Sequence, residues 1–196
     1  GFADGNATAD LYVGSADGTV TLIAGAVDRD LEASATVPVG GVPASIATGD
    51  FDGDGDDDLV AGLDKLGWIR LVRTSGRSLQ PATTVIGVGS PVAVSAGDLA
   101  GDPARDDVAT VTAEGMLMAW ESTGGFDLTP VLETPVGVAP SDVRIADLDE
   151  DGDGDLLAAV AQELPQSFRL RAYVQDPDGF AELMPVAEDR RMIAFE

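Results

Sequence analysis

The sequence predicts an all-β protein built from four repeated units. Short runs of apolar and β-branched residues alternate with turns rich in glycine, proline and aspartate. No stretch of ten or more residues shows helical periodicity. A third observation is that an aspartate followed by an apolar residue recurs at intervals of 48, 49 and 48 residues, at Asp10-Leu11, Asp58-Leu59, Asp107-Val108 and Asp155-Leu156.

A constant period of this size indicates an array in which no unit buries its apolar face alone. Four such units account for all 196 residues. We therefore expect a single repeat domain over 1–196, with repeats at approximately 1–49, 50–97, 98–146 and 147–196.

Each unit divides into four strand-like runs bounded by turn signals. In the first unit these runs are 11–14, 19–23, 35–39 and 45–47. In the second they are 59–63, 68–74, 83–86 and 92–96, separated by turn signals at 64–67, 75–78 and 87–91. Both sets combine β-branched and apolar residues with the glycines that turns require.

The third and fourth units repeat this pattern. The third gives 108–112, 116–121, 131–134 and 143–146, and the fourth gives 156–161, 168–174, a weaker run at 182–186, and 192–195. Four short strands in about 48 residues match one blade of a β-propeller, in which four-stranded sheets repeat around a central channel. The fold class predicted is therefore a β-propeller of four four-stranded blades.

Two windows of alternating aspartates stand out, at 50–58 and 147–155. In both, carboxylates occupy relative positions 1, 3, 5, 7 and 9, with a glycine at position 6 (Gly55 and Gly152). No basic residue lies inside either window, so these carboxylates repel one another unless a cation binds. Ca²⁺ takes six to eight oxygen ligands, and a glycine with positive φ permits the tight turn that brings alternate side chains together.

These windows are not EF-hand loops, because an EF-hand closes with a bidentate glutamate at position 12. Position 12 here is Ala61 or Ala158, and a strand-like run starts directly after the ninth residue. The alternative to a metal site is a solvated acidic turn.

The windows, each with its following apolar run, resemble the FG-GAP/VCBS repeat. Such repeats form the blades of integrin-α-type propellers and of many secreted bacterial proteins. The resemblance implies a hairpin loop between the first and second strands of a blade, with Ca²⁺ held by side chains at positions 1, 3, 5 and 9 and by the carbonyl at position 7. Carried over, the implied ligands are Asp50, Asp52, Asp54, Asp56 and Asp58 in the second unit and Asp147, Asp149, Asp151, Asp153 and Asp155 in the fourth.

The other two units match this pattern weakly. In the third, the loop is one residue longer, has Ala100 at position 3 and contains Arg105. A missing carboxylate and an added cation both lower the affinity for a metal. The weaker metal candidates are Asp98, Asp102 and Asp107 in the third unit and Asp4, Asn6 and Asp10 in the first.

The two ends of the sequence are related to each other. The first unit lacks the strand that should precede its loop, whereas 191–196 resembles 44–50 and places Glu196 at position 1 of a loop. One expectation is that 192–195 completes the first blade and closes a four-blade ring, since closure removes exposed strand edges. Glu196 would then join the metal candidates of the first loop. The alternative is that four blades form part of a larger propeller.

Composition limits the possible functions. The sequence carries 35 acidic and 11 basic residues, a formal net charge of −24, and neither histidine nor cysteine. We therefore expect no nucleic-acid partner. Catalysis by Ser-His-Asp or Cys-His groups is excluded, as are His-based zinc sites and disulfides. No apolar run approaches the 18 or so residues of a membrane span, so we expect no membrane insertion.

These observations favour an extracellular or cell-surface interaction or adhesion module in which Ca²⁺ is structural. Extracellular Ca²⁺ modules work with weak sites that cytosolic calcium would not fill. We expect no enzymatic activity, a protein or glycan partner, and association with further propeller repeats. The alternatives are a polysaccharide lyase or hydrolase on a propeller scaffold and a lectin. The recurring aromatics Trp68, Trp120 and Phe168 are expected to pack between blades, or else to stack on sugars.

Overall fold

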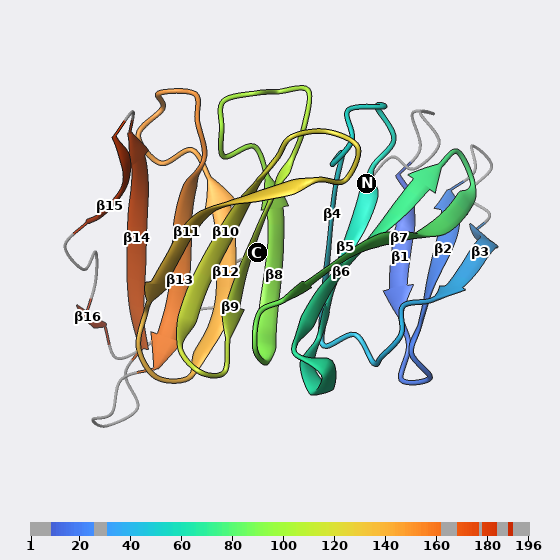
Figure 1. Cartoon of the computed structure of the whole chain (residues 1–196), viewed down its shortest axis with the longest axis horizontal. Helices are drawn as coiled ribbons and strands as arrows, with labels where there is room; N and C mark the ends of the chain where they lie inside the picture. The colour runs from blue at the N-terminus through green and yellow to red at the C-terminus, as the bar shows by residue number, and fades with distance from the viewer. Residues whose placement is uncertain (1–8, 26–30, 162–167, 177, 184–187, 190–196) are drawn as a thin grey trace.

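The computed structural model describes residues 9–25, 31–161, 168–176, 178–183 and 188–189. Within these ranges the chain forms four antiparallel β-sheets, and its one helical element is the 3-10 turn η1 (Asp64–Leu66). Figure 1 shows the sheets following one another in chain order along the long axis of the molecule. The all-β class and the repeated-sheet organisation predicted from the sequence are confirmed.

The first two sheets come from the N-terminal half. Sheet 1 has the order β1-β2-β3, formed by β1 (Leu11–Gly14), β2 (Thr19–Gly25) and β3 (Leu31–Pro38). Sheet 2 has the order β4-β5-β6-β7, formed by β4 (Ser45–Gly49), β5 (Asp58–Leu63), β6 (Trp68–Ser75) and β7 (Ser78–Gly87). Each strand pairs with the next along the chain, as in a β-meander.

The C-terminal half repeats this meander twice. Sheet 3 contains β8 (Pro91–Gly97), β9 (Asp107–Thr112), β10 (Met116–Ser122) and β11 (Leu128–Pro135). Sheet 4 contains β12 (Pro140–Ala146), β13 (Asp155–Ala161), β14 (Phe168–Asp176) and β15 (Gly179–Glu182), and the short β16 (Glu188–Asp189) also pairs with β14.

The strands agree with the expected runs except at some ends. Three outer strands start earlier than expected. β3 starts four residues earlier, at Leu31, β7 five residues earlier, at Ser78, and β11 three residues earlier, at Leu128. In sheet 4 the outer strand is β15 at Gly179–Glu182, so the weaker run expected at 182–186 was placed too late. The expected strand 192–195 lies outside the described residues.

The sheets are offset from the sequence repeats. The strand before each acidic window pairs with the strand after it, so β4 pairs with β5, β8 with β9, and β12 with β13. The expected repeat boundaries therefore fall inside these hairpins, and each window is the loop between the first and second strands of a sheet. This is the position that the FG-GAP resemblance implied.

Strand periodicity explains how the sheets stack. Successive side chains of a strand point to opposite faces. In β5, Leu59, Ala61 and Leu63 pack against sheet 1, whereas Val60 packs against sheet 3. Both faces of the strand are buried because a sheet lies on each side. This explains why its sequence is apolar at consecutive positions rather than alternating.

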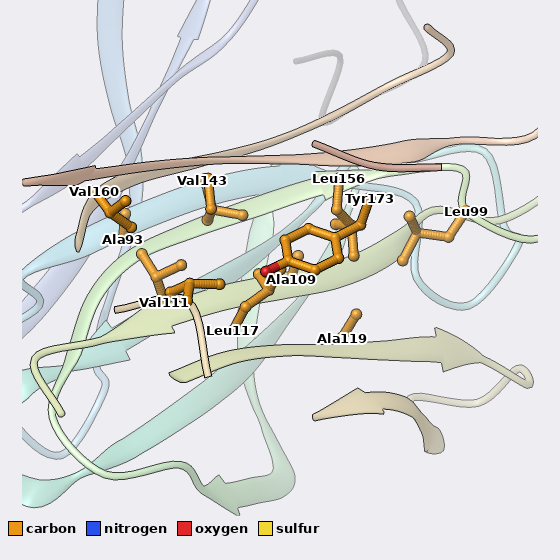
Figure 2. Packing of buried hydrophobic residues seen from close by; sticks show 12 residues of the cluster. Ala93, Leu99, Ala109, Val111, Leu117, Ala119, Val143, Leu156, Val160 and Tyr173 are labelled. Atoms are coloured by element: carbon orange, nitrogen blue, oxygen red, sulfur yellow. The ribbon is translucent and has the colours of Figure 1, made fainter. Parts of the chain in front are cut away.

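Three apolar cores result, one between each pair of neighbouring sheets. Figure 2 shows the core between sheets 3 and 4, where Leu117 and Val111 face Leu156 and the ring of Tyr173. Each leucine that is fully buried in this way contributes about 1.5–3 kcal/mol. Because no sheet buries its faces alone, stability depends on the neighbouring sheets, as the repeat predicted.

The aromatic residues divide into two environments. Trp120 is buried between sheets 2 and 3, which confirms its expected packing role. Trp68 is 43% exposed at the start of β6, so the expectation that it packs between blades is wrong. Trp68 is the first residue of β6 and directly follows η1 and Gly67, so it lies at the end of its strand rather than in the middle of the sheet. The side chain of Phe168 lies outside the described part of the chain.

The first strands of sheets 2, 3 and 4 line up beside one another, with β8 between β4 and β12. Sheet 1 and sheet 4 lie at opposite ends of the row in Figure 1. The arrangement places the three described hairpin loops, β4–β5, β8–β9 and β12–β13, along one rim.

Candidate metal centres

The loop between β4 and β5, residues 50–57 (loop 2), is organised by its first aspartate. One carboxylate oxygen of Asp50, Oδ1, accepts the backbone N–H of Gly53 at 2.7 Å and that of Asp54 at 3.2 Å. The other, Oδ2, accepts the N–H of Gly55 at 2.8 Å. Gly55 has φ +89°, which confirms the positive φ expected at this position.

This turn brings three carboxylates together. One oxygen from each of Asp50, Asp52 and Asp54 lies within 4.8 Å of the others. Oxygens that converge in this way on a partly exposed loop form a donor set that suits a hard cation. Positions 1, 3 and 5 of the predicted site are therefore adjacent in space as well as regularly spaced in sequence.

The loop between β12 and β13, residues 147–154 (loop 4), repeats this geometry. Asp147 accepts the N–H of Glu150 at 2.7 Å through Oδ1 and that of Gly152 at 3.2 Å through Oδ2. Gly152 has the expected positive φ, +101°. The carboxylates of Asp147, Asp149 and Asp151 converge within 4.8 Å.

Loop 4 also holds a strained residue. Glu150 has φ +64° at the position where loop 2 has Gly53. A side chain in the left-handed region carries a steric cost that glycine avoids. The loop geometry is thus kept in the fourth unit even though the residue at this position is unfavourable for it.

The ninth residue of each window has a structural position that the spacing alone did not reveal. Asp58 is fully buried, and its two oxygens accept the N–H of Phe51 at 3.2 Å and that of Thr74, on β6, at 2.7 Å. Asp155 is equally buried and accepts the corresponding N–H groups of Leu148 at 2.7 Å and Gln175 at 2.9 Å. These residues tie the loop to the third strand of the sheet.

We call this residue the closing aspartate, and it recurs in every sheet. Asp107 accepts N–H groups from Leu99 at 2.7 Å, Ala100 at 3.1 Å and Ser122 at 2.7 Å. Asp10 accepts the N–H of Gly25 at 2.8 Å. The period of 48 or 49 residues therefore marks a hydrogen-bonding group common to all four sheets, whether or not the loop resembles a metal site.

Burial and crowding raise the pKa of several of these carboxyl groups. Burial, with added repulsion from Asp52, raises the pKa of Asp58 to about 8. Burial, followed by hydrogen bonding and repulsion from Asp151, raises that of Asp153 to about 6. Burial also raises the pKa values of Asp52 and Asp149, and repulsion from a neighbouring carboxylate, Asp54 or Asp151 respectively, adds to the shift. A nearby divalent cation would oppose all of these shifts, because it favours the charged form.

Position 7 differs between the two loops. The side chain of Asp56 accepts the N–H of Gly76 at 2.8 Å, in the turn after β6. At the matching position of the fourth repeat the sequence has Pro177, a residue type without a backbone N–H. Oδ1 of Asp153 is buried without a hydrogen-bond partner among the described residues. Calcium ligation by the carbonyls of Asp56 and Asp153 stays a prediction.

The loop between β8 and β9, residues 98–106 (loop 3), contains its own cation. Arg105 forms an ion pair with Asp102, and the N–H of Asp102 bonds to Asp98 at 2.9 Å. Asp98, Asp102 and Asp107 do not form a convergent group, and the groups found among the described residues are those of loops 2 and 4. This agrees with the expectation that the added arginine and the missing carboxylate weaken the third site.

Loop 3 nevertheless contacts both neighbouring loops. Asp106 accepts the N–H of Asp50 at 2.9 Å through Oδ2, and its own N–H donates to the Asp50 carbonyl at 2.7 Å. On the other side, a Cβ added at Gly154 would lie 2.0 Å from the Asp98 carbonyl oxygen, so only glycine fits there. The three loops therefore form a continuous row.

The structure describes only part of the first unit. Asp10 is buried and takes part in the hydrogen bond described above. Asp4, Asn6 and Glu196, the other metal candidates of this unit, lie outside the described residues.

Sequence reasoning missed one basic residue at loop 2. Nη2 of Arg73, on β6, lies 2.7 Å from Oδ2 of Asp52 and 3.1 Å from Oδ2 of Asp54. Its guanidinium carbon also lies 5.9 Å from the centre of the Phe126 ring, from the turn after β10. Arg73 immediately precedes Thr74, whose N–H donates to the closing aspartate Asp58. This relation could have placed the arginine beside loop 2. That relation requires the cross-strand register.

Comparison with solved structures shows the fold class. The chain resembles a "putative 6-phosphogluconolactonase" from Bacteroides uniformis, with a TM-score of 0.67, 13% identity, and coverage of 96% of this chain and 57% of that one. It also resembles BBS1N in two complexes with ARL6DN, soaked with lead or with mercury. The TM-scores are 0.57 and 0.59, each at 16% identity, covering 82% of this chain and 45% or 42% of that one. These folds are β-propeller-like, and so is this one.

The chain spans about half the length of each of these proteins. No family model matches the sequence. No curated protein matches it either. In the part of the chain that the structure describes, no helix has both the length and the apolar character needed to cross a membrane.

Proposed function

We propose that this protein is a calcium-binding β-propeller of the FG-GAP/VCBS type that works as an extracellular or cell-surface interaction module. The observation that carries the proposal is the convergence of three carboxylates within 4.8 Å in each of two hairpin loops of the same spacing. The windows 50–58 and 147–155 hold six acidic residues each. The repulsion among these residues would be a large cost for a turn that binds no cation.

The donor chemistry fits Ca²⁺ better than other metals. Calcium accepts many oxygen ligands in flexible geometry, whereas Mg²⁺ requires a tight octahedron and gives up its water reluctantly. The loops offer carboxylates at positions 1, 3 and 5. Each oxygen of the closing aspartates Asp58 and Asp155 also keeps a lone pair beyond its hydrogen bond. Soft transition metals prefer sulfur or imidazole ligands, and the sequence has no cysteine or histidine.

Calcium in these loops would serve structure. Loops 2 and 4 join the first and second strands of their sheets, and their closing aspartates bond to the third strand. A cation that fixes the loop therefore fixes three strands at one rim, while the other surfaces of the sheets stay free for a protein or glycan partner.

We also propose that the four sheets are an arc of a larger propeller rather than a closed four-blade ring. Sheets 1 and 4 lie at opposite ends of the row in Figure 1, and each structural neighbour is about twice as long as this chain. The arc would associate with further propeller repeats, which would cover the end sheets.

Deleting residues 191–196 tests this arrangement. In an arc, the deletion is expected to leave the melting temperature in calcium and the monomeric size-exclusion profile unchanged. In a closed ring, the same deletion would expose a strand edge in the first blade, and open edges invite pairing with other chains. A clear fall in melting temperature together with new oligomers would therefore overturn the arc.

The raised pKa values predict a calcium effect that depends on pH. A carboxyl whose pKa is raised on folding stabilises the fold at low pH, and this contribution is lost as pH rises through the folded-state value. For Asp58 the loss runs from about pH 4 to about pH 8. In chelator, the melting temperature should therefore fall over this range. Calcium should restore it at pH 8 and have little effect at pH 5, because its ligands must be deprotonated.

The measurement is a set of melting curves from pH 5 to pH 8 in calcium and in chelator. A calcium effect of equal size at both ends of the range would contradict the assignment of the buried, crowded carboxyls to the binding site.

The interaction role is tested on candidate partners. A glycan array probed in calcium and in chelator, together with a screen for release of reducing sugars, separates a lectin, an enzyme and a protein-binding module. One observation favours the lectin as second candidate, because Trp68 is 43% exposed and offers an aromatic face for stacking. We expect no release of sugar. Calcium-dependent glycan binding that Trp68→Ala abolishes would favour the lectin, and release of sugar would establish an enzyme.

A further inference from the structure

An arginine contacts the carboxylate oxygens of loop 2 that accept no hydrogen bond from the loop backbone. Oδ1 of Asp52 accepts the N–H of Asp54, and Oδ1 of Asp54 accepts that of Asp56, at 3.2 and 3.0 Å. The remaining oxygen of each aspartate, Oδ2, faces Arg73 at 2.7 and 3.1 Å. The guanidinium group therefore contacts the two oxygens that the loop backbone leaves available.

Arg73 is itself held in place from another sheet. The ring of Phe126 lies 5.9 Å from its guanidinium carbon, within reach of a cation–π interaction. Phe126 is buried in the core between sheets 2 and 3. The arginine therefore approaches loop 2 from the side of sheet 3, between a rigid aromatic ring and the carboxylates.

The corresponding position differs in every other sheet. In each sheet, one backbone N–H from β2, β6, β10 or β14 donates to the closing aspartate, and the position in question is the residue just before that donor. The residues at this position in the four sheets are Ala24, Arg73, Glu121 and Val174. Loop 4 thus has a valine where loop 2 has an arginine. Among the described residues, no ion pair to Asp149 or Asp151 replaces it.

We propose that Arg73 is a built-in counter-ion of loop 2 that competes with the divalent cation, so that loop 2 binds calcium more weakly than loop 4. This inference rests on the proposed calcium function. It divides the two sites, which look alike in sequence, into a tight site that stabilises sheet 4 and a weaker site that fills only at higher calcium.

Elementary electrostatics gives the direction and the scale. A guanidinium about 5 Å from a doubly charged ion, at the dielectric constant of water, weakens binding on the order of tenfold. Arg73 is 45% exposed, so salt screens the effect. When calcium is absent, the same arginine neutralises part of the repulsion among the aspartates. Its removal should therefore destabilise the calcium-free protein while tightening calcium binding.

The experiment isolates one loop at a time by calorimetric titration with calcium chloride. Asp151→Ala disables loop 4 and leaves loop 2, and Arg73→Met is then added to this background. We expect Arg73→Met to tighten calcium binding roughly tenfold and to lower the melting temperature in chelator. The matched control is Arg70→Met, which makes the same charge change on the same strand but removes a side chain that bonds to the Val39 carbonyl. It should leave the calcium affinity within about twofold.

A second variant transfers the arginine to the other loop. Val174→Arg, in a background where Asp54→Ala disables loop 2, should weaken calcium binding by loop 4 to a similar degree. This variant keeps the inference testable even if Arg73→Met folds poorly.

The outcomes separate the two proposals. If Arg73→Met leaves the calcium affinity of loop 2 unchanged or weakens it, the counter-ion role is overturned, while the proposed calcium function stands. A parent protein that takes up no calcium in either background overturns the proposed function itself. Tighter binding in Arg73→Met with weaker binding in Val174→Arg supports the inference.

Discussion

Replacing Asp107 with alanine is expected to destabilise the fold by about 3–5 kcal/mol, equally in calcium and in chelator. The carboxylate is almost fully buried and accepts N–H groups from Leu99, Ala100 and Ser122. Each buried donor left without a partner costs about 1–3 kcal/mol. Because loop 3 has no convergent carboxylates, the loss should not depend on metal.

The matched control is Asp102→Ala in the same loop. Its carboxylate pairs with Arg105 at the surface, where exposed ion pairs contribute at most about 1 kcal/mol. Urea unfolding curves of both variants, with calcium and with chelator, give the comparison. A loss from Asp107→Ala below about 1 kcal/mol, or one that appears only in calcium, would contradict the role assigned to the closing aspartate.

Adding millimolar calcium to the parent protein is expected to raise its melting temperature by roughly 10–20 °C, and chelator should reverse the change. A ligand that binds only the folded state contributes about 2.7 kcal/mol per site at a hundredfold excess over Kd. Two sites therefore contribute about 5 kcal/mol. For a domain of this size, each kcal/mol raises the melting temperature by about 2–4 °C.

Magnesium at the same concentration is the control for a general charge effect. It screens the net charge of −24 as well as calcium does but suits the loops poorly. Calcium should therefore stabilise clearly more than magnesium. Superimposable melting curves in the two ions would show that screening, and not a specific site, stabilises the fold.

Much of the fold could be predicted from the sequence because its signals are local. The period of 48 or 49 residues and the glycine-rich turns define the sheets, and alternation within β5 sends Leu59 and Val60 to opposite cores. Strand ends were less certain. The outer strand β15 at Gly179–Glu182 has four residues, three of them exposed, and Phe180 packs against the core, so the apolar signal that marks it is short.

The candidate sites were predictable only in part. Spacing identified Asp50, Asp52 and Asp54, whose positions depend on a local turn at Gly55. The hydrogen bonds of Asp58 and the approach of Arg73 join residues that are far apart in sequence. They depend on the pairing of β5 with β6, and no motif within the loop encodes that register.

A calorimetric titration with calcium of the parent and three alanine variants tests the central claim most directly. The account predicts two binding sites in the parent, and one each in Asp54→Ala and Asp151→Ala, because each removes a central carboxylate from a convergent group. Asp102→Ala should retain both sites, since its loop has Arg105 as an internal cation. No calcium uptake by the parent, or loss of a site in Asp102→Ala equal to that in Asp54→Ala, would contradict the account.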